Sequence, residues 1–308
     1  MMRAAIVLLL LFTTKISYAI SVENHQYVSQ VAIRSYQQCL SKLKMQDHLQ
    51  QGEAAIAQYA PLEDQSPILD RYFNWHFYDA HRDTPQRMGR TITGARKSLH
   101  HIFQLRIQQL DEAIRTTDVD NIYNYSGRVM HYIQDMSVPA HVAPIYHYKF
   151  ILDHSDYFDS IPEWTNTDDV TLTTEACQTL NHAKKDMSTG LKTILDISAT
   201  HTLFRVSSTI PAPRDHILFG KTWASAFWNI RDPAKEADYP SDIKQGFAPY
   251  GEQGHDGFRR LCETDIGSVD HKLCMNFFQA SYLQAIRSSV QALLLINHTI
   301  SEHSIASP

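Results

Sequence analysis

The chain has 308 residues, of which 43% are hydrophobic, and it carries a formal net charge of -5 at pH 7. This length and apolar content suit a globular protein with a sizeable core and exclude a disordered chain. The negative charge disfavours a broad surface for binding a nucleic acid backbone. The 17 histidines are numerous, and histidine is the commonest metal ligand and acid–base residue near neutrality.

The N-terminus has a basic residue at Arg3, a short apolar run over residues 4–12 and a small-x-small ending at residues 17–19. This pattern is typical of a secretory signal peptide. We therefore expect residues 1–19 to be removed, the mature domain to cover residues 20–308, and the protein to be secreted or periplasmic. An uncleaved membrane anchor is the alternative, although the apolar run is short for a membrane span.

The chain contains four cysteines, and an exported protein can form disulfides from them. Four cysteines allow three pairings. Cys262 and Cys274 are close in sequence and flank a turn-like stretch, which favours that pair. No two cysteines have the close spacing of a zinc or redox motif.

Several stretches have apolar residues at three- and four-residue steps, which predicts amphipathic helices. These stretches cover residues 22–44, 93–115, 119–136, 171–199 and 275–300. Residues 211–257 are rich in proline, glycine and aromatic residues without a regular period, so we expect loops over a helical core there. Because no series of segments shows the alternating apolar and polar residues of β-strands, the sequence predicts a single all-α domain.

The strongest local pattern is His131 followed by Asp135, four residues apart on a predicted helix. Their side chains project from one face, so the pair can hold one divalent metal, or two if the carboxylate bridges. Pro139 breaks this helix and gives His141 a new backbone direction, from which it can reach a second metal. The alternative is an amphipathic helix whose His and Asp make ordinary polar contacts.

Three earlier segments carry further candidate ligands. His76 lies between two aromatic residues that favour burial, and a buried imidazole needs a partner such as a metal. The carboxylates of Glu63 and Asp64 lie in a loop flanked by prolines, from which they can point into a cleft, and His25 lies near the expected mature N-terminus. Nitrogen and oxygen ligands without thiolates suit a hydrolytic zinc site.

The run SGRVMHYIQDMSVPAHV over residues 126–142 resembles the signature of the zinc-dependent phospholipase C family and of its relatives, the S1/P1-type nucleases. Residues 63–64 followed by NWHFYD over residues 74–79 resemble a second motif of the family. Residues 23–32 resemble its N-terminal start. The three motifs occur in the family's order over the first half of the mature chain.

This resemblance implies an all-helical domain of the zinc phospholipase C and P1 nuclease type, with long irregular loops, that holds three zinc ions. It implies that the first ion is bound by Asp64, His76, His131 and Asp135. It further implies that Asp135 bridges to another ion, held also by His25 and by the terminal amine and carbonyl of Ile20, where the family usually has Trp.

The remaining ion would be bound by His141 and by two later ligands, where this sequence departs from the family pattern. The family adds a His and, four residues later, a Glu or Asp. We favour His154 and Asp159, which have one extra residue between them. Four other residues compete for these two roles: His147, Asp156, His182 and Asp186.

These ligands predict hydrolysis of a phosphate ester, because zinc lowers the pKa of bound water to about 7. Asp64 is expected to orient or deprotonate the attacking water. The residues of these motifs resemble the bacterial phospholipase branch of the family. We therefore expect the substrate to be a phospholipid at a membrane surface, cleaved to diacylglycerol and a phosphorylated headgroup. Nothing in the sequence demands a dimer, and we expect a monomer.

The aromatic residues between 146 and 164 are candidates for boxing a choline headgroup by cation–π contact, with core packing as the alternative. They are Tyr146, Tyr148, Phe150, Tyr157, Phe158 and Trp164. Two other functions stay open: a single-strand nuclease or nucleotidase that stacks bases on such aromatics, and a non-catalytic zinc- or lipid-binding protein.

Overall fold

The computed structural model of the chain describes residues 22–65, 76–78, 99–143, 145, 156–161, 172, 177, 186–230 and 248–306. These residues form helices joined by loops, and they contain isolated β-bridges such as Thr209 with Thr222 but no strand. The predicted all-α class is therefore confirmed for this part of the chain.

The helices of the described residues are α1 (Val22–Leu43), η1 (Gln50–Gly52), α2 (Glu53–Tyr59), α3 (Leu62–Gln65), α5 (Leu99–Arg115), α6 (Val119–Asp135), α7 (Pro139–Val142), η2 (Tyr157–Ser160), α9 (Met187–Ser207), α10 (Trp223–Ala226), α12 (Gly257–Cys262) and α13 (Val269–Ala306). The predicted helices over residues 22–44, 119–136 and 275–300 are confirmed, and α13 is longer than predicted at both ends. The helix predicted over residues 93–115 is confirmed from Leu99 onward, because the residues before it lie outside the described range. The loops predicted over residues 211–257 are confirmed where they are described, apart from the single turn of α10.

The helix predicted over residues 171–199 is wrong in its boundaries. Leu172 is not helical, and α9 begins at Met187, because the side chain of Asp186 accepts a hydrogen bond from the Thr189 backbone N–H at 2.9 Å and caps the helix. The helix then continues past Ala199 to Ser207.

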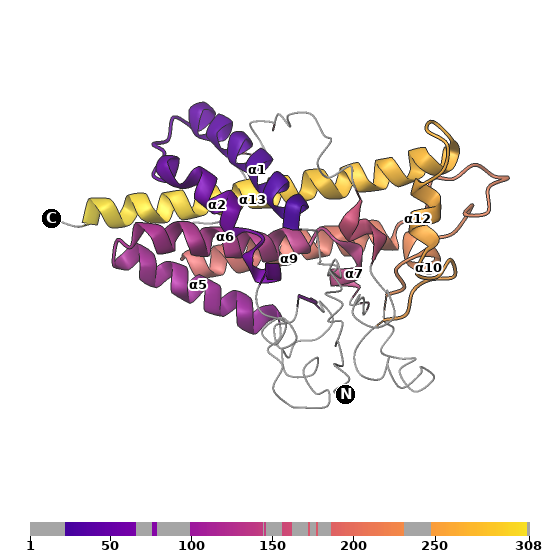
Figure 1. The fold of residues 1–308 in the computed structure, drawn as a ribbon, viewed down its shortest axis with the longest axis horizontal. Coiled ribbons are helices and arrows are strands. Elements are labelled where there is room, and N and C mark those ends of the chain that lie inside the picture. Colours follow the sequence, from indigo (N-terminus) through magenta and orange to yellow (C-terminus); the bar gives the residue numbers. More distant parts are fainter. Residues whose placement is uncertain are drawn as a thin grey trace, which may run out of the picture.

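The long helices α5, α6, α9 and α13 run alongside one another as an elongated bundle, with α1 and α2 covering one side (Figure 1). The central helix α13 packs against α1, α6 and α9, and α5 packs against α6. Residues 292–296 of α13 are all buried, as expected of a helix segment that is apolar all round. Among the helices described, none is long and apolar enough to cross a membrane.

The start and end of α6 position the candidate site. Asp118 caps its N-terminus by accepting a hydrogen bond from the Asn121 backbone N–H at 3.2 Å. The helix ends at Asp135, and Pro139 begins the next helix α7 at its first position, where its missing N–H costs nothing. The chain therefore turns between Asp135 and His141, as predicted.

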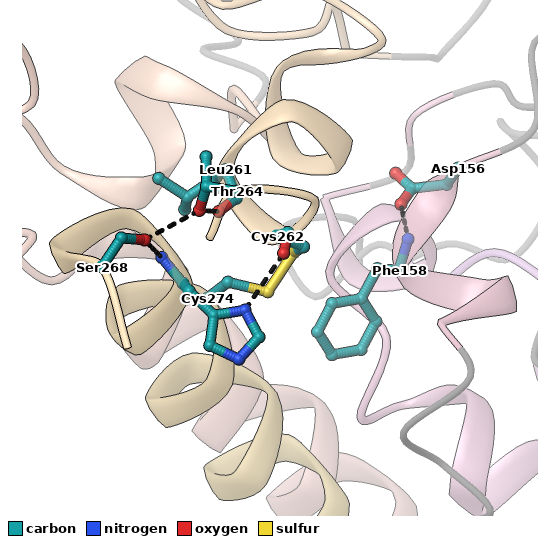
Figure 2. The surroundings of a disulfide bond; sticks show 8 residues. Asp156, Phe158, Leu261, Cys262, Thr264, Ser268 and Cys274 are labelled. Atoms are coloured by element: carbon teal, nitrogen blue, oxygen red, sulfur yellow. Dashed lines mark hydrogen bonds between the residues drawn. A yellow bond between two sulfur atoms is a disulfide. The ribbon is translucent and has the colours of Figure 1, made fainter. Parts of the chain in front are cut away.

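Two disulfides join distant elements. Cys262–Cys274 links α12 to the start of α13 (Figure 2), which confirms the favoured pairing. The His271 ring lies 3.1 Å from the backbone oxygen of Cys262. Cys39 of α1 pairs with Cys177. No free cysteine is found among the described residues. Such bonds persist in an oxidising environment, in agreement with the expected export.

The aromatic residues proposed as a headgroup box include one core residue. Phe158 is fully buried and packs edge-on against Trp228 and Phe277, at ring-centroid distances of 5.9 Å each. Its assignment to a substrate rim is therefore wrong, because aromatic residues from α12, α13 and the loop before residue 231 surround it. Tyr157 is partly buried, and the other four candidates lie outside the described residues.

Candidate metal centre

Six of the predicted ligands converge although they come from separate elements. α1 contributes His25, α3 contributes Asp64, residues 76–78 contribute His76, α6 contributes His131 and Asp135, and α7 contributes His141. Five of these side chains are at most 2% exposed, whereas that of His76 is 13% exposed. The cluster is thus sealed by protein on most sides and reaches solvent beside His76.

Asp135 lies at the centre of the cluster and faces ligands on both of its oxygens. Its Oδ1 lies 3.3 Å from Nε2 of His25. Its Oδ2 lies 2.9 Å from Nδ1 of His76 and 3.4 Å from Nε2 of His131. A carboxylate with nitrogen ligands on both oxygens has the arrangement expected of a bridge between two ions.

The three atoms on the Oδ2 side have the spacing of a zinc coordination shell. Nδ1 of His76 and Nε2 of His131 are 3.1 Å apart, so with Asp135 Oδ2 they form a triangle with sides of 2.9, 3.1 and 3.4 Å. Ligands about 2.0–2.1 Å from a tetrahedral ion lie roughly 3.4 Å from one another. The residues present therefore fit a divalent metal.

Asp64 lies between the two sides of the cluster. Its Oδ2 is 3.7 Å from His25 Nε2, and its Oδ1 is 4.0 Å from His131 Nε2. His25, Asp64 and His131 thus form a second group that could hold a metal ion. Since His131 offers a single Nε2 lone pair, the two groups share that nitrogen and cannot both use it.

The ring of His141 has a defined proton position. Its Nδ1 lies 3.0 Å from the backbone oxygen of His76, which can only accept a hydrogen bond. Nδ1 therefore carries the proton and the neutral ring keeps its lone pair on Nε2. The same nitrogen lies 3.7 Å from Asp135 Oδ2, so His141 borders the cluster through its first ring nitrogen.

The electrostatics of the metal-free cluster place positive charge opposite the two carboxylates. Burial lowers the pKa of His25, but Asp135 outweighs burial and raises it overall, and the pKa of His76 is raised for the same reasons. Burial and the positive charge of His25 hold the pKa of His131 well below its usual range. Burial opposes ionisation of Asp135, but the four surrounding histidines together outweigh burial and hold its pKa well below normal. A divalent ion would supply positive charge opposite these carboxylates.

Glu63 does not point freely into a cleft from a loop, as the sequence led us to expect. It belongs to the short helix α3, is buried, and accepts hydrogen bonds from Arg106 at 2.5 and 3.1 Å and from Arg128 at 3.0 Å. Burial raises the pKa of Glu63, but these guanidinium groups outweigh burial and lower it overall. The two arginines come from α5 and α6, so no local sequence pattern indicated this contact.

The later candidate ligands have different surroundings. Asp159 is fully buried, and Asn24 donates to its backbone oxygen at 3.3 Å, which brings η2 next to the start of α1. Asp156 accepts hydrogen bonds from the Phe158 backbone at 2.9 Å and from the indole of Trp228 at 2.8 Å, so its oxygens are used within the fold. Asp186 is an exposed helix cap. The remaining candidates lie outside the described residues: Ile20, His147, His154 and His182.

The sequence analysis missed Gln134, which directly precedes Asp135 in α6. Its Oε1 lies 2.7 Å from Nδ1 of His25, and the residue is fully buried. The only local signal was a glutamine that lies between an apolar residue and a candidate ligand in a helix. This signal does not indicate which helix packs against Gln134.

Comparison of the chain with protein-family models, with curated proteins and with solved structures gives no match.

Proposed function

We propose that this chain is a secreted, zinc-dependent phosphoric ester hydrolase of the phospholipase C type. The observation that supports this most directly is the Asp135 carboxylate, which faces His25 on one oxygen and both His76 and His131 on the other. Nitrogen and oxygen ligands without thiolates favour zinc in a hydrolytic role. The motif resemblance over residues 126–142 points to the same family.

In this proposal the six clustered side chains bind the zinc ions. Asp159 is kept as a ligand of the ion that His141 binds. When bound, zinc lowers the pKa of water to about 7 and offsets the negative charge of a phosphate ester. His76 is the most exposed member of the cluster, so the ester enters on its side. The other five side chains are at most 2% exposed, so little water reaches the cluster, which strengthens each charge interaction within it.

Asp64 is the residue that we assign to proton handling. Its two oxygens face His25 and His131 at 3.7 and 4.0 Å, farther than the oxygens of Asp135 lie from the same rings. A carboxylate at this separation has room to accept a hydrogen bond from a water molecule beside the cluster. It can therefore orient that water and take its proton as the phosphate ester is attacked.

The substrate class that we propose is a glycerophospholipid at a membrane surface, cleaved to diacylglycerol and a phosphorylated headgroup by a monomeric enzyme. The net charge of -5 favours this over a nucleic acid substrate, which needs a positively charged path for its backbone. Export follows from the N-terminal pattern of residues 1–19 and agrees with the two disulfides.

The test uses the mature protein beginning at Ile20, loaded with zinc and freed of excess ion. Release of phosphocholine from phosphatidylcholine vesicles, abolished in Asp135→Asn, is the expected result. Release of nucleotides from single-stranded DNA without lipid cleavage would replace the phospholipase proposal by a nuclease. Stoichiometric zinc without either activity would show a binding protein and overturn the enzymatic assignment.

A further inference from the structure

Gln134 links three helices behind the metal-ligand cluster. Its Oε1 lies 2.7 Å from Nδ1 of His25 in α1. Its Nε2 donates to the hydroxyl of Ser29 in α1 at 2.9 Å and to the hydroxyl of Ser289 in α13 at 3.2 Å. All four side chains are at most 1% exposed, so water does not compete for these contacts.

The amide nitrogen can only donate hydrogen bonds and the amide oxygen can only accept them. This difference decides which ring nitrogen of His25 carries the proton. The amide nitrogen offers two N–H groups, and both are directed at serine hydroxyls. The amide oxygen can only accept, so the nitrogen of His25 that faces it must donate. In a neutral ring, a proton on Nδ1 leaves the lone pair on Nε2.

The lone pair on Nε2 is directed at the cluster. Nε2 of His25 lies 3.3 Å from Asp135 Oδ1 and 3.7 Å from Asp64 Oδ2, and it makes no hydrogen bond of standard geometry within the described part of the chain. A buried nitrogen that faces two carboxylate oxygens without a hydrogen bond is suited to binding a cation rather than to a second donor role.

We propose that Gln134 is a positioning residue for the metal site: it fixes the ring of His25 with the proton on Nδ1 and presents Nε2 as a ready-made ligand for a divalent cation. This inference rests on the proposed metal centre but not on the proposed substrate. Ser29 and Ser289 accept both N–H groups of the amide, which leaves its carbonyl oxygen facing His25. Outer partners of this kind commonly set ligand orientation and basicity.

The first test is made on the unaltered protein. In the zinc-loaded chain, long-range nitrogen–proton NMR spectra of the imidazoles, assigned with His25→Asn, should show His25 protonated on Nδ1 and metal-bound through Nε2. Zinc-bound protein with the proton of His25 on Nε2 would overturn the inference, as would a protein that binds no zinc at all.

The second test compares variants by chelator competition for zinc. Gln134→Leu and Gln134→Asn remove the acceptor in different ways, and each should weaken zinc binding by about 10- to 100-fold. Gln134→Glu keeps an acceptor for Nδ1 and should restore affinity. Ser289→Ala removes one of the two hydroxyls that hold the amide and should weaken zinc binding less than Gln134→Leu does. Lower melting temperatures in all four variants with unchanged zinc affinity would mean that Gln134 serves packing alone.

The inference and the proposed function fail separately. A chain that binds zinc with the stated tautomer, and loses affinity in Gln134→Leu, supports the role of Gln134 even if no phospholipid is cleaved. A chain that cleaves phospholipid while Gln134→Leu and Gln134→Asn keep full zinc affinity supports the function and overturns the role.

Discussion

Arg106 holds Glu63 with two parallel hydrogen bonds, from Nε to Oε1 at 2.5 Å and from Nη2 to Oε2 at 3.1 Å. This two-pronged geometry is the strongest form of arginine–carboxylate contact. It connects α5 to α3, one residue before Asp64, and therefore anchors the short helix that brings Asp64 into the cluster.

Replacing Glu63 by Gln should destabilise the fold at neutral pH by about 3 kcal/mol, because two partly buried guanidinium groups lose their buried counter-charge. The pKa of Glu63 is lowered in the folded state. Its stabilising contribution is therefore complete above its unfolded pKa and is lost as pH falls through the folded value. Denaturant unfolding with chelator present should show the difference in stability between the two proteins shrinking as pH falls below about 4, the ordinary pKa of glutamate. Glu112→Gln, at an exposed ion pair with Arg115, is the matched control and should change stability little.

Replacing Asp135 by Asn should remove one negative charge that faces all four histidines of the cluster. Zinc affinity should fall by more than about 100-fold, which exceeds the usual effect of an outer partner. Metal analysis after dialysis at limiting zinc measures this loss. Asp111→Asn on the exposed face of α5 is the control, since its carboxylate forms a solvent-exposed ion pair with Arg115. Full zinc content in Asp135→Asn would remove the central ligand from the proposed site.

Replacing Asp64 by Asn separates proton transfer from metal binding. We expect turnover of the phosphate ester to fall by about 100-fold or more, the usual contribution of a general base, while zinc content falls much less. Steady-state assays and metal analysis on the same preparation measure both. If zinc is lost in proportion to activity, Asp64 acts as a ligand alone and the assigned base role is incorrect.

The two disulfides should differ in their effect on stability. Cys39–Cys177 closes a segment with a sequence separation of 138, whereas Cys262–Cys274 closes one of 12. On the chain-entropy account, removing the first by double Cys→Ser substitution should cost about 5 kcal/mol and removing the second about 3 kcal/mol. Urea unfolding of the two variants compares these costs. Equal losses would indicate that strain or residual structure, rather than loop length, decides their contribution.

The local geometry of α6 explains why part of the site was predictable. His131 and Asp135 are one helical turn apart, and Pro139 ends the helix before His141, so the spacing alone predicted their proximity. The expectation that His25 and His76 lie beside them came from the motif resemblance, because no local sequence pattern at either residue specifies contact with α6.

The parts that could not be predicted depend on packing between distant segments. Every residue from 129 to 143 is buried, so the usual alternation between a buried and an exposed helix face disappears there and gave no sign of the role of Gln134. Phe158 likewise lies in a stretch of aromatic and acidic residues, and only the packing of Trp228 and Phe277 around it makes it a core residue. The start of α9 was mistaken because the Asp186 cap resembles any other acidic position in sequence.

The contact between Gln134 and Ser289 also sets the order in which the molecule can mature. All six clustered ligands lie before residue 142, so they leave the ribosome early. The hydroxyl that completes the support behind His25 belongs to α13, which is made last among the helices described. A nascent chain can thus contain all six clustered residues before Ser289 is present to bind the Gln134 amide behind His25. In the proposed metal centre, the support behind His25 is therefore complete only after residue 289 has been synthesised and α13 has docked.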